Sequence, residues 1–94
     1  MNLSYTPQAV KQIQKLPQAE KKKVIRKLEL LVTDPKVGKP LKGELEGLYS
    51  LRAWPYRIIY KIKSSTIIIY SVAHRQSAYR KWRNFHEKYH SGNR

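Results

Sequence analysis

Three short runs rich in Ile, Tyr and Leu lie in the second half of the sequence, and they constrain the fold more than any other feature. They cover residues 48–53, 56–62 and 66–72, and their composition predicts β-strands. Connections of two and three residues join consecutive runs, and connections this short make neighbouring strands antiparallel. The chain is therefore expected to contain a three-stranded antiparallel meander.

The first connection, Trp54-Pro55, decides which side chains meet across the first two strands. A two-residue connection pairs Ala53 with Tyr56. Arg52 then lies directly opposite Arg57 on one face of the sheet. A slip of one residue would separate the two arginines onto opposite faces, because side chains alternate along a strand. The turn lacks the Asn-Gly or Gly-Gly pair that specifies such a register most strongly.

Basic residues gather at one end of this predicted meander. The second hairpin brings His74 and Arg75 to the end where Arg52 and Arg57 lie. Like charges opposite one another destabilise a sheet unless an anion lies among them, so we expect these three arginines to form a phosphate site beside Tyr79. The alternative is that they are surface charges paired with acidic residues. His74 is the candidate for proton transfer, with a structural role as its alternative.

Two helices are expected before the meander. Residues 3–6 alternate like a short edge strand, and Thr6-Pro7 then resembles a helix start, with a hydroxyl N-cap and proline at the first helical position. Pro17 ends this helix, and a second helix runs from there to the residue before Asp34-Pro35. Its apolar residues form one amphipathic stripe: Val24, Ile25, Leu28, Leu31 and Val32. Residues 34–43 read as a loop.

Two further groups of cations accompany the predicted helices. Five lie on the polar face of the second helix: Lys21, Lys22, Lys23, Arg26 and Lys27. They are either a solvated face or a patch that contacts a nucleic-acid backbone. From residue 77 onward, aromatic residues at helical spacing predict a C-terminal helix whose aromatic stripe packs. Its cations are further binding candidates: Arg80, Lys81 and Arg83.

Composition narrows the class of protein. The 94 residues suffice for a single domain, and twenty Lys and Arg against six Asp and Glu give a net charge of +14, which attracts polyanions. The chain has no cysteine, which excludes disulfides and thiolate chemistry, and its histidines lack metal-site spacing. We expect neither metal nor cofactor. No membrane-spanning run or signal peptide is visible, so a cytoplasmic protein without a membrane partner is expected.

The predicted architecture is α+β: a two-helix N-terminal hairpin packed on a small antiparallel β-sheet, followed by a C-terminal helix. An arginine cluster on such a sheet suits RNA chemistry, because guanidinium groups match phosphate oxygens and stay charged at physiological pH. They stabilise the negative charge that develops when a 2′-hydroxyl attacks the adjacent phosphorus. A tyrosine ring can stack on a splayed base.

The strings LKGELEGLYSLRAWPYRIIYKI and IIIYSVAHRQSAYR resemble the RelE/ParE superfamily of toxins from toxin–antitoxin systems, in its RelE-like branch. The strand motif x-Y-R-[IV]-[IV]-Y and the element H-R-x-x-x-Y carry the likeness, which extends over nearly the whole chain. The resemblance implies the microbial RNase type of fold. It also implies an mRNA interferase that cuts the codon in the ribosomal A site by 2′-hydroxyl attack, without a metal.

By position, the resemblance also implies roles for four residues. Arg52 matches a basic residue of the catalytic strand, and Arg57 matches the arginine that stabilises the phosphate. Arg75 falls on the residue that assists the leaving group, and Tyr79 on the tyrosine that stacks with the mRNA base. Where RelE members can carry a lysine, this chain has Ser50, which leaves the general base open.

The resemblance implies a cognate acidic antitoxin of the RelB type, and the net charge of +14 suits such a partner. We expect that the C-terminal helix can cover the site and that the antitoxin stabilises or displaces it. Two other functions stay open. One is a ParE-like inhibitor of DNA gyrase, which shares the fold and cleaves no RNA. The other is a basic RNA-binding module without catalysis.

Overall fold

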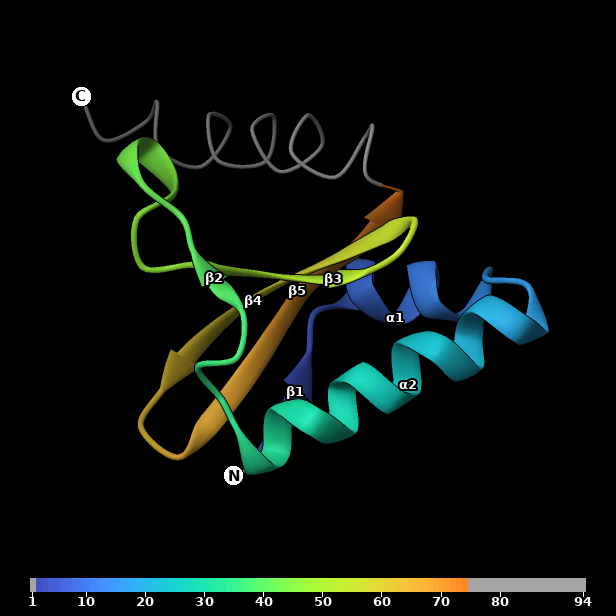
Figure 1. Ribbon diagram of the computed structural model, residues 1–94, viewed down its shortest axis with the longest axis horizontal. Coiled ribbons are helices and arrows are strands. Elements are labelled where there is room, and N and C mark those ends of the chain that lie inside the picture. Colours follow the sequence, from blue (N-terminus) through green and yellow to red (C-terminus); the bar gives the residue numbers. More distant parts are fainter. Residues whose placement is uncertain (1, 75–94) are drawn as a thin grey trace.

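The computed structural model describes residues 2–74, in which a five-stranded sheet has two helices against one face (Figure 1). The elements follow in the order β1 (Asn2–Tyr5), α1 (Pro7–Gln14), α2 (Gln18–Thr33), β2 (Lys39–Pro40), a 3-10 turn (Gly43–Leu45), β3 (Tyr49–Ala53), β4 (Tyr56–Lys63) and β5 (Thr66–His74). The predicted α+β class is confirmed. The predicted C-terminal helix lies outside the described residues.

The sheet has the strand order β1-β5-β4-β3-β2. The predicted meander is confirmed, because β3 and β4 pair antiparallel, as do β4 and β5. The prediction of a wholly antiparallel sheet is wrong, since β1 pairs parallel with β5. A local pattern reveals a strand but not a partner more than sixty residues away in sequence. The predicted loop before the meander also contains β2, which pairs with β3 through Lys39 and Pro40.

The helix boundaries follow from the residues that cap them. Pro7 is the first residue of α1, and the Thr6 side chain accepts a hydrogen bond from the Ala9 amide at 3.1 Å. This satisfies one of the amides that a helix leaves unpaired at its start. Pro17 precedes α2, which ends at Thr33. The predicted start of α1 and both limits of α2 are confirmed, whereas α1 already ends at Gln14, before the Pro17 that was expected to end it. Neither helix within residues 2–74 is long and apolar enough to cross a membrane.

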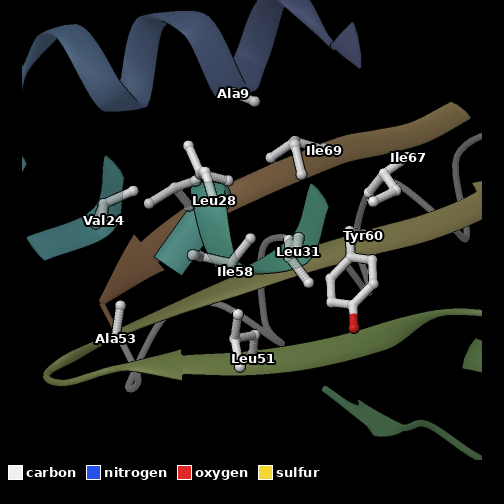
Figure 2. Packing of buried hydrophobic residues seen from close by; sticks show 11 residues of the cluster. Ala9, Val24, Leu28, Leu31, Leu51, Ala53, Ile58, Tyr60, Ile67 and Ile69 are labelled. Carbon is white, nitrogen blue, oxygen red and sulfur yellow. The ribbon is translucent and has the colours of Figure 1, made fainter. Parts of the chain in front are cut away.

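The main core lies between the two helices and the sheet, where side chains from both layers point toward one another (Figure 2). Its helical residues are Ala9, Val24, Leu28 and Leu31, and its strand residues are Leu51, Ala53, Ile58, Tyr60, Ile67, Ile69 and Val72. The predicted α2 stripe is too wide, because Ile25 and Val32 remain 44% and 37% exposed. Only the narrower line of α2 that faces the sheet is buried.

The other face of the sheet carries a smaller apolar cluster. It contains Leu48 and Ile59, with Leu41, Leu45 and Tyr70 packed against them. Ile58 faces the helices and its neighbour Ile59 faces this second cluster, as alternation along a strand requires. The two faces of the sheet are therefore distinct. Among residues 2–74, α1 and α2 cover one face, and the other face carries this smaller cluster.

Tyr60 is a buried polar connection between the sheet and the segment that follows α2. Its hydroxyl donates to the Pro35 carbonyl at 2.8 Å and accepts from the Gly38 amide at 2.9 Å. A Cβ at Gly38 would lie 2.5 Å from the Tyr60 hydroxyl oxygen, so only glycine permits this approach. Burial raises the pKa of Tyr60 above its usual 10.0, and the Gly38 hydrogen bond partly opposes this shift.

We expect Tyr60→Phe to lower the free energy of unfolding by about 1–3 kcal/mol, because the buried Gly38 amide loses its acceptor. The raised pKa means that the unfolded chain ionises first as pH rises, so the wild type loses stability above about pH 10. The Tyr60→Phe variant has no hydroxyl to ionise at this position, so it should not show this part of the loss of stability at alkaline pH. Urea unfolding at pH 7 and pH 10.5 measures both effects, with Tyr49→Phe as the control for the neighbouring ring. If Tyr60→Phe and Tyr49→Phe were equally stable, the hydrogen bond between the Tyr60 hydroxyl and the Gly38 amide would not contribute to stability.

Candidate functional site

The β3–β4 hairpin places two arginines opposite one another. Ala53 pairs with Tyr56, and Arg52 pairs with Arg57, which confirms the register expected from a two-residue connection. The neighbouring pair, Leu51 and Ile58, belongs to the core under the helices. Because side chains alternate, Arg52 and Arg57 lie on the face away from the helices. Arg52 is exposed and Arg57 is half-buried.

Two positive charges in opposed positions make this corner of the sheet electropositive. Guanidinium groups keep their charge at any physiological pH, and like charges directly across a strand pair destabilise the sheet. The Arg52 guanidinium also lies over the Trp54 ring, 5.9 Å from its centroid. An anion bound between the two arginines would relieve their repulsion and gain charge-assisted hydrogen bonds.

One cation of α2 reaches this hairpin. The Lys23 amine donates to the Trp54 carbonyl at 2.9 Å and forms an ion pair with Glu20 at 3.5 Å. Lys23 thereby attaches α2 to the hairpin turn. The other members of the predicted α2 patch lie on the same helix, and their role stays a prediction: Lys21, Lys22, Arg26 and Lys27.

His74 reaches the same end of the sheet but lies on the other face. It pairs with Tyr56, and the two rings meet edge to face with centroids 5.9 Å apart. Arg57 pairs instead with Ala73. Because consecutive residues alternate, His74 is on the helix side of the sheet. Its role in proton transfer stays a prediction.

The remaining predicted site residues follow His74 in the sequence. Arg75, Tyr79, Arg80, Lys81 and Arg83 lie outside the described residues. Within residues 2–74, no three or more His, Asp or Glu side chains are grouped to hold a metal ion. The described part of the site is therefore the arginine pair with Trp54 and Lys23 beside it.

A β-bulge in β5 sets the alignment of that strand with the site. Tyr60 pairs with Ile69, whereas Ile59 pairs with Ser71, so Tyr70 is an extra residue in β5. Without this shift, the pairing of Tyr60 with Ile69 would continue until Arg57 met Val72. With the shift, Arg57 meets Ala73 and the end of β5 moves by one residue. The bulge therefore decides which residues of the His74 region share a face with the arginines.

Helix α1 supplies hydrogen-bond partners for the backbone around this bulge. The Thr6 hydroxyl donates to the Tyr70 carbonyl at 2.9 Å, and the Gln12 side-chain oxygen accepts from the Val72 amide at 2.7 Å. The Thr6 amide donates to the Ile69 carbonyl at 3.0 Å. Backbone groups displaced from a regular ladder need such partners. Sequence reasoning identified Thr6 only as a helix cap and missed Gln12, because nothing local marks a helical glutamine as the partner of a distant strand.

The sequence is similar to a known protein family and to two characterised proteins. The family model described as the ParE toxin of the type II toxin–antitoxin system parDE matches residues 3–79. Toxin RelE of Mycobacterium tuberculosis is 31% identical over 83 residues, which cover 84% of this chain and 86% of that relative. Toxin RelG of the same organism is 44% identical over 48 residues, which cover 49% of this chain and 55% of RelG. The chain thus matches about half the length of RelG.

A solved structure with the same fold belongs to the same group of proteins. The toxin–antitoxin complex RelBE2 of Mycobacterium tuberculosis contains a chain that is 34% identical, with a TM-score of 0.72. The match covers 78% of this chain and 95% of that one. The similarity therefore extends over nearly the entire matched chain of that complex.

We expect Gln12→Leu to lower the free energy of unfolding by about 1–3 kcal/mol, because the Val72 amide loses its acceptor. The amide resonances of Val72, Ala73 and His74 should shift as the bulge loosens. Gln12→Glu keeps an acceptor oxygen and should preserve both properties. The matched control is Gln14→Leu, on an exposed position of the same helix. If Gln12→Leu and Gln14→Leu gave the same stability and the same Val72 resonance, Gln12 would not hold the bulge.

Proposed function

This chain belongs to the ParE toxin family of type II toxin–antitoxin systems, and we propose that it inhibits translation by cutting mRNA. The proposed enzyme is a metal-independent endoribonuclease of the RelE-like branch, acting in the cytoplasm on the codon in the ribosomal A site. The single observation that carries this proposal is the opposed pair of Arg52 and Arg57 on the face of the sheet opposite α1 and α2.

The arginine pair suits the charge changes of RNA cleavage. The 2′-oxygen attacks phosphorus and forms a new P–O bond, while the bond from phosphorus to the 5′-oxygen breaks. The 2′-hydroxyl gives up a proton and the leaving 5′-oxygen takes one. Extra negative charge accumulates on the phosphate oxygens between these events, and fixed guanidinium donors stabilise it. Arg52 and Arg57 are the proposed donors.

The proposal assigns further roles beyond the described residues. Arg75 assists the leaving oxygen and Tyr79 stacks on the mRNA base, as the family resemblance implies. His74 is retained as the candidate for proton transfer, since it is the imidazole at this end of the sheet.

The proposed function requires binding partners. We propose a cognate acidic antitoxin of the RelB type, supported by the toxin–antitoxin complex formed by the similar RelBE2 proteins and by the net charge of +14. The mRNA and the ribosome are the other partners. Cations of α2 and of the C-terminal segment contact their phosphates: Lys21, Lys22, Lys23, Arg26, Lys27, Arg80, Lys81 and Arg83. No cofactor takes part.

Arg57→Ala should reduce mRNA cleavage about a hundredfold or more, because one preorganised donor to the transition state is lost. It should also relieve growth arrest on expression. Arg57→Lys keeps the charge without the planar fork and should restore only part of the activity. The control is Lys61→Ala, an exposed cation on the same strand, which should remain toxic. Circular dichroism checks the fold of each variant. Unchanged toxicity of an Arg57→Ala/Arg75→Ala double variant would refute the nuclease.

A second candidate function is ParE-like inhibition of DNA gyrase, which the match to the ParE family model over residues 3–79 favours. It requires no opposed arginines. Two measurements on the wild-type chain separate the candidates: 5′ ends of cellular mRNA after brief expression, and gyrase supercoiling with purified protein. We expect codon-phased cuts confined to translated messages and unimpaired supercoiling. Blocked supercoiling with intact messages would instead establish the gyrase inhibitor.

A further inference from the structure

Trp54 is the most exposed large apolar side chain among residues 2–74, at 52%. It lies in the two-residue connection between β3 and β4, outside both apolar clusters of the sheet. An indole contributes a large stabilising area when it is buried, and here about half of that area remains in contact with solvent. The core therefore does not explain this residue.

The position of the ring relates it to the arginine pair. The Arg52 guanidinium lies 5.9 Å from the Trp54 ring centroid, and Arg52 pairs across the sheet with Arg57. A cation over one face of a ring is attracted by the ring's electrons, and about half of the Trp54 side chain stays exposed beside that cation. The Lys23 amine donates to the Trp54 carbonyl at 2.9 Å, which restrains the backbone that carries the ring.

We propose that Trp54 is a stacking platform for a nucleobase of single-stranded RNA, adjacent to the phosphate held by Arg52 and Arg57. This inference rests on the proposed RNA substrate and adds a second ring to the site. Each nucleotide presents one aromatic plane beside one phosphate. A ring next to a pair of guanidinium groups therefore offers one contact for the base and one for the phosphate.

The chemistry of the surroundings favours RNA over an apolar protein segment as the occupant. Arg52 and Lys23 both contact Trp54, and Arg57 lies across from Arg52. A nucleotide supplies both a plane that stacks on the ring and an anion for the opposed arginines, whereas an apolar side chain supplies only a contact with the ring. Stacking accepts any base, because every base has a π-face.

The test measures binding separately from cleavage. The probe is a fluorescently labelled RNA hexamer with 2′-O-methyl groups throughout, which lack the attacking hydroxyl, compared with hexamers that carry a single abasic site at each position in turn. Anisotropy is recorded at low salt, where the charge of +14 favours binding. We expect an abasic site to weaken binding about tenfold to a hundredfold at each position where a base stacks on a ring. Trp54→Ala should abolish this penalty at one critical position, and Trp54→Phe should retain part of it.

Intrinsic fluorescence gives a direct readout of the ring. The sequence has two tryptophans, Trp54 and Trp82, so a Trp82→Phe chain carries Trp54 as its single indole. The complete hexamer should quench this emission, and the hexamer with the critical abasic site should not. The matched control is Tyr5→Ala, which removes an aromatic residue that is 39% exposed on β1 and should leave binding unchanged.

The outcomes distinguish this inference from the proposed nuclease. A Trp54-dependent penalty for the abasic site, in a wild type that cuts no message, would support stacking and defeat the nuclease. Cleavage by the wild type together with equal binding of complete and abasic hexamers would overturn stacking and leave the nuclease in place. Quenching by an acidic antitoxin peptide and not by RNA would also overturn it, because the ring would then belong to a protein interface.

Discussion

The register between β3 and β4 is the constraint on which the site depends. Opposed Arg52 and Arg57 cost stability through their repulsion, so something stronger must hold them in place. That force is the burial of Ile58 and Tyr60 under the helices, both of them fully buried. A slip of one residue would turn Arg57 into the core and Ile58 toward solvent. The burial of apolar side chains on one face of β4 therefore determines the position of Arg57 on the other face.

The bulge in β5 is a second constraint, and it connects the beginning of the chain to the site. Thr6 donates to the carbonyls of Ile69 and of the extra residue Tyr70, and Gln12 accepts from the Val72 amide. Thr6 also accepts a hydrogen bond from the first turn of α1, so the helix start and the bulge share one hydroxyl. Helix α1 thus takes part in aligning β5 as well as in covering the core. Loss of the packing of α1 would therefore change the alignment of Ala73 and His74, which are far from α1 in sequence.

Features set by neighbouring residues were predictable, and features set by distant contacts were not. Thr6-Pro7 and Pro17 marked where the two helices start, and the short Trp54-Pro55 connection marked the arginine register. The parallel pairing of β1, the β5 bulge and the exposure of Ile25 arise from tertiary packing, which no local pattern records. The strand motif around Arg57 identified the superfamily, which the family match confirms. The positions of Arg75 and Tyr79 lie outside the described residues and stay predictions.

Long-range charge and short-range geometry have separate tasks in the proposed function. A net charge of +14 attracts any polyanion, and its pull is screened over about 10 Å at 0.1 M salt. It therefore cannot distinguish an mRNA from an acidic antitoxin. Discrimination has to come from groups in contact: guanidinium forks that fit one phosphate, and the Trp54 ring that fits one base. Because arginine does not titrate in the physiological range, competition between substrate and inhibitor would be governed by fit and salt rather than by the charge state of the arginine pair.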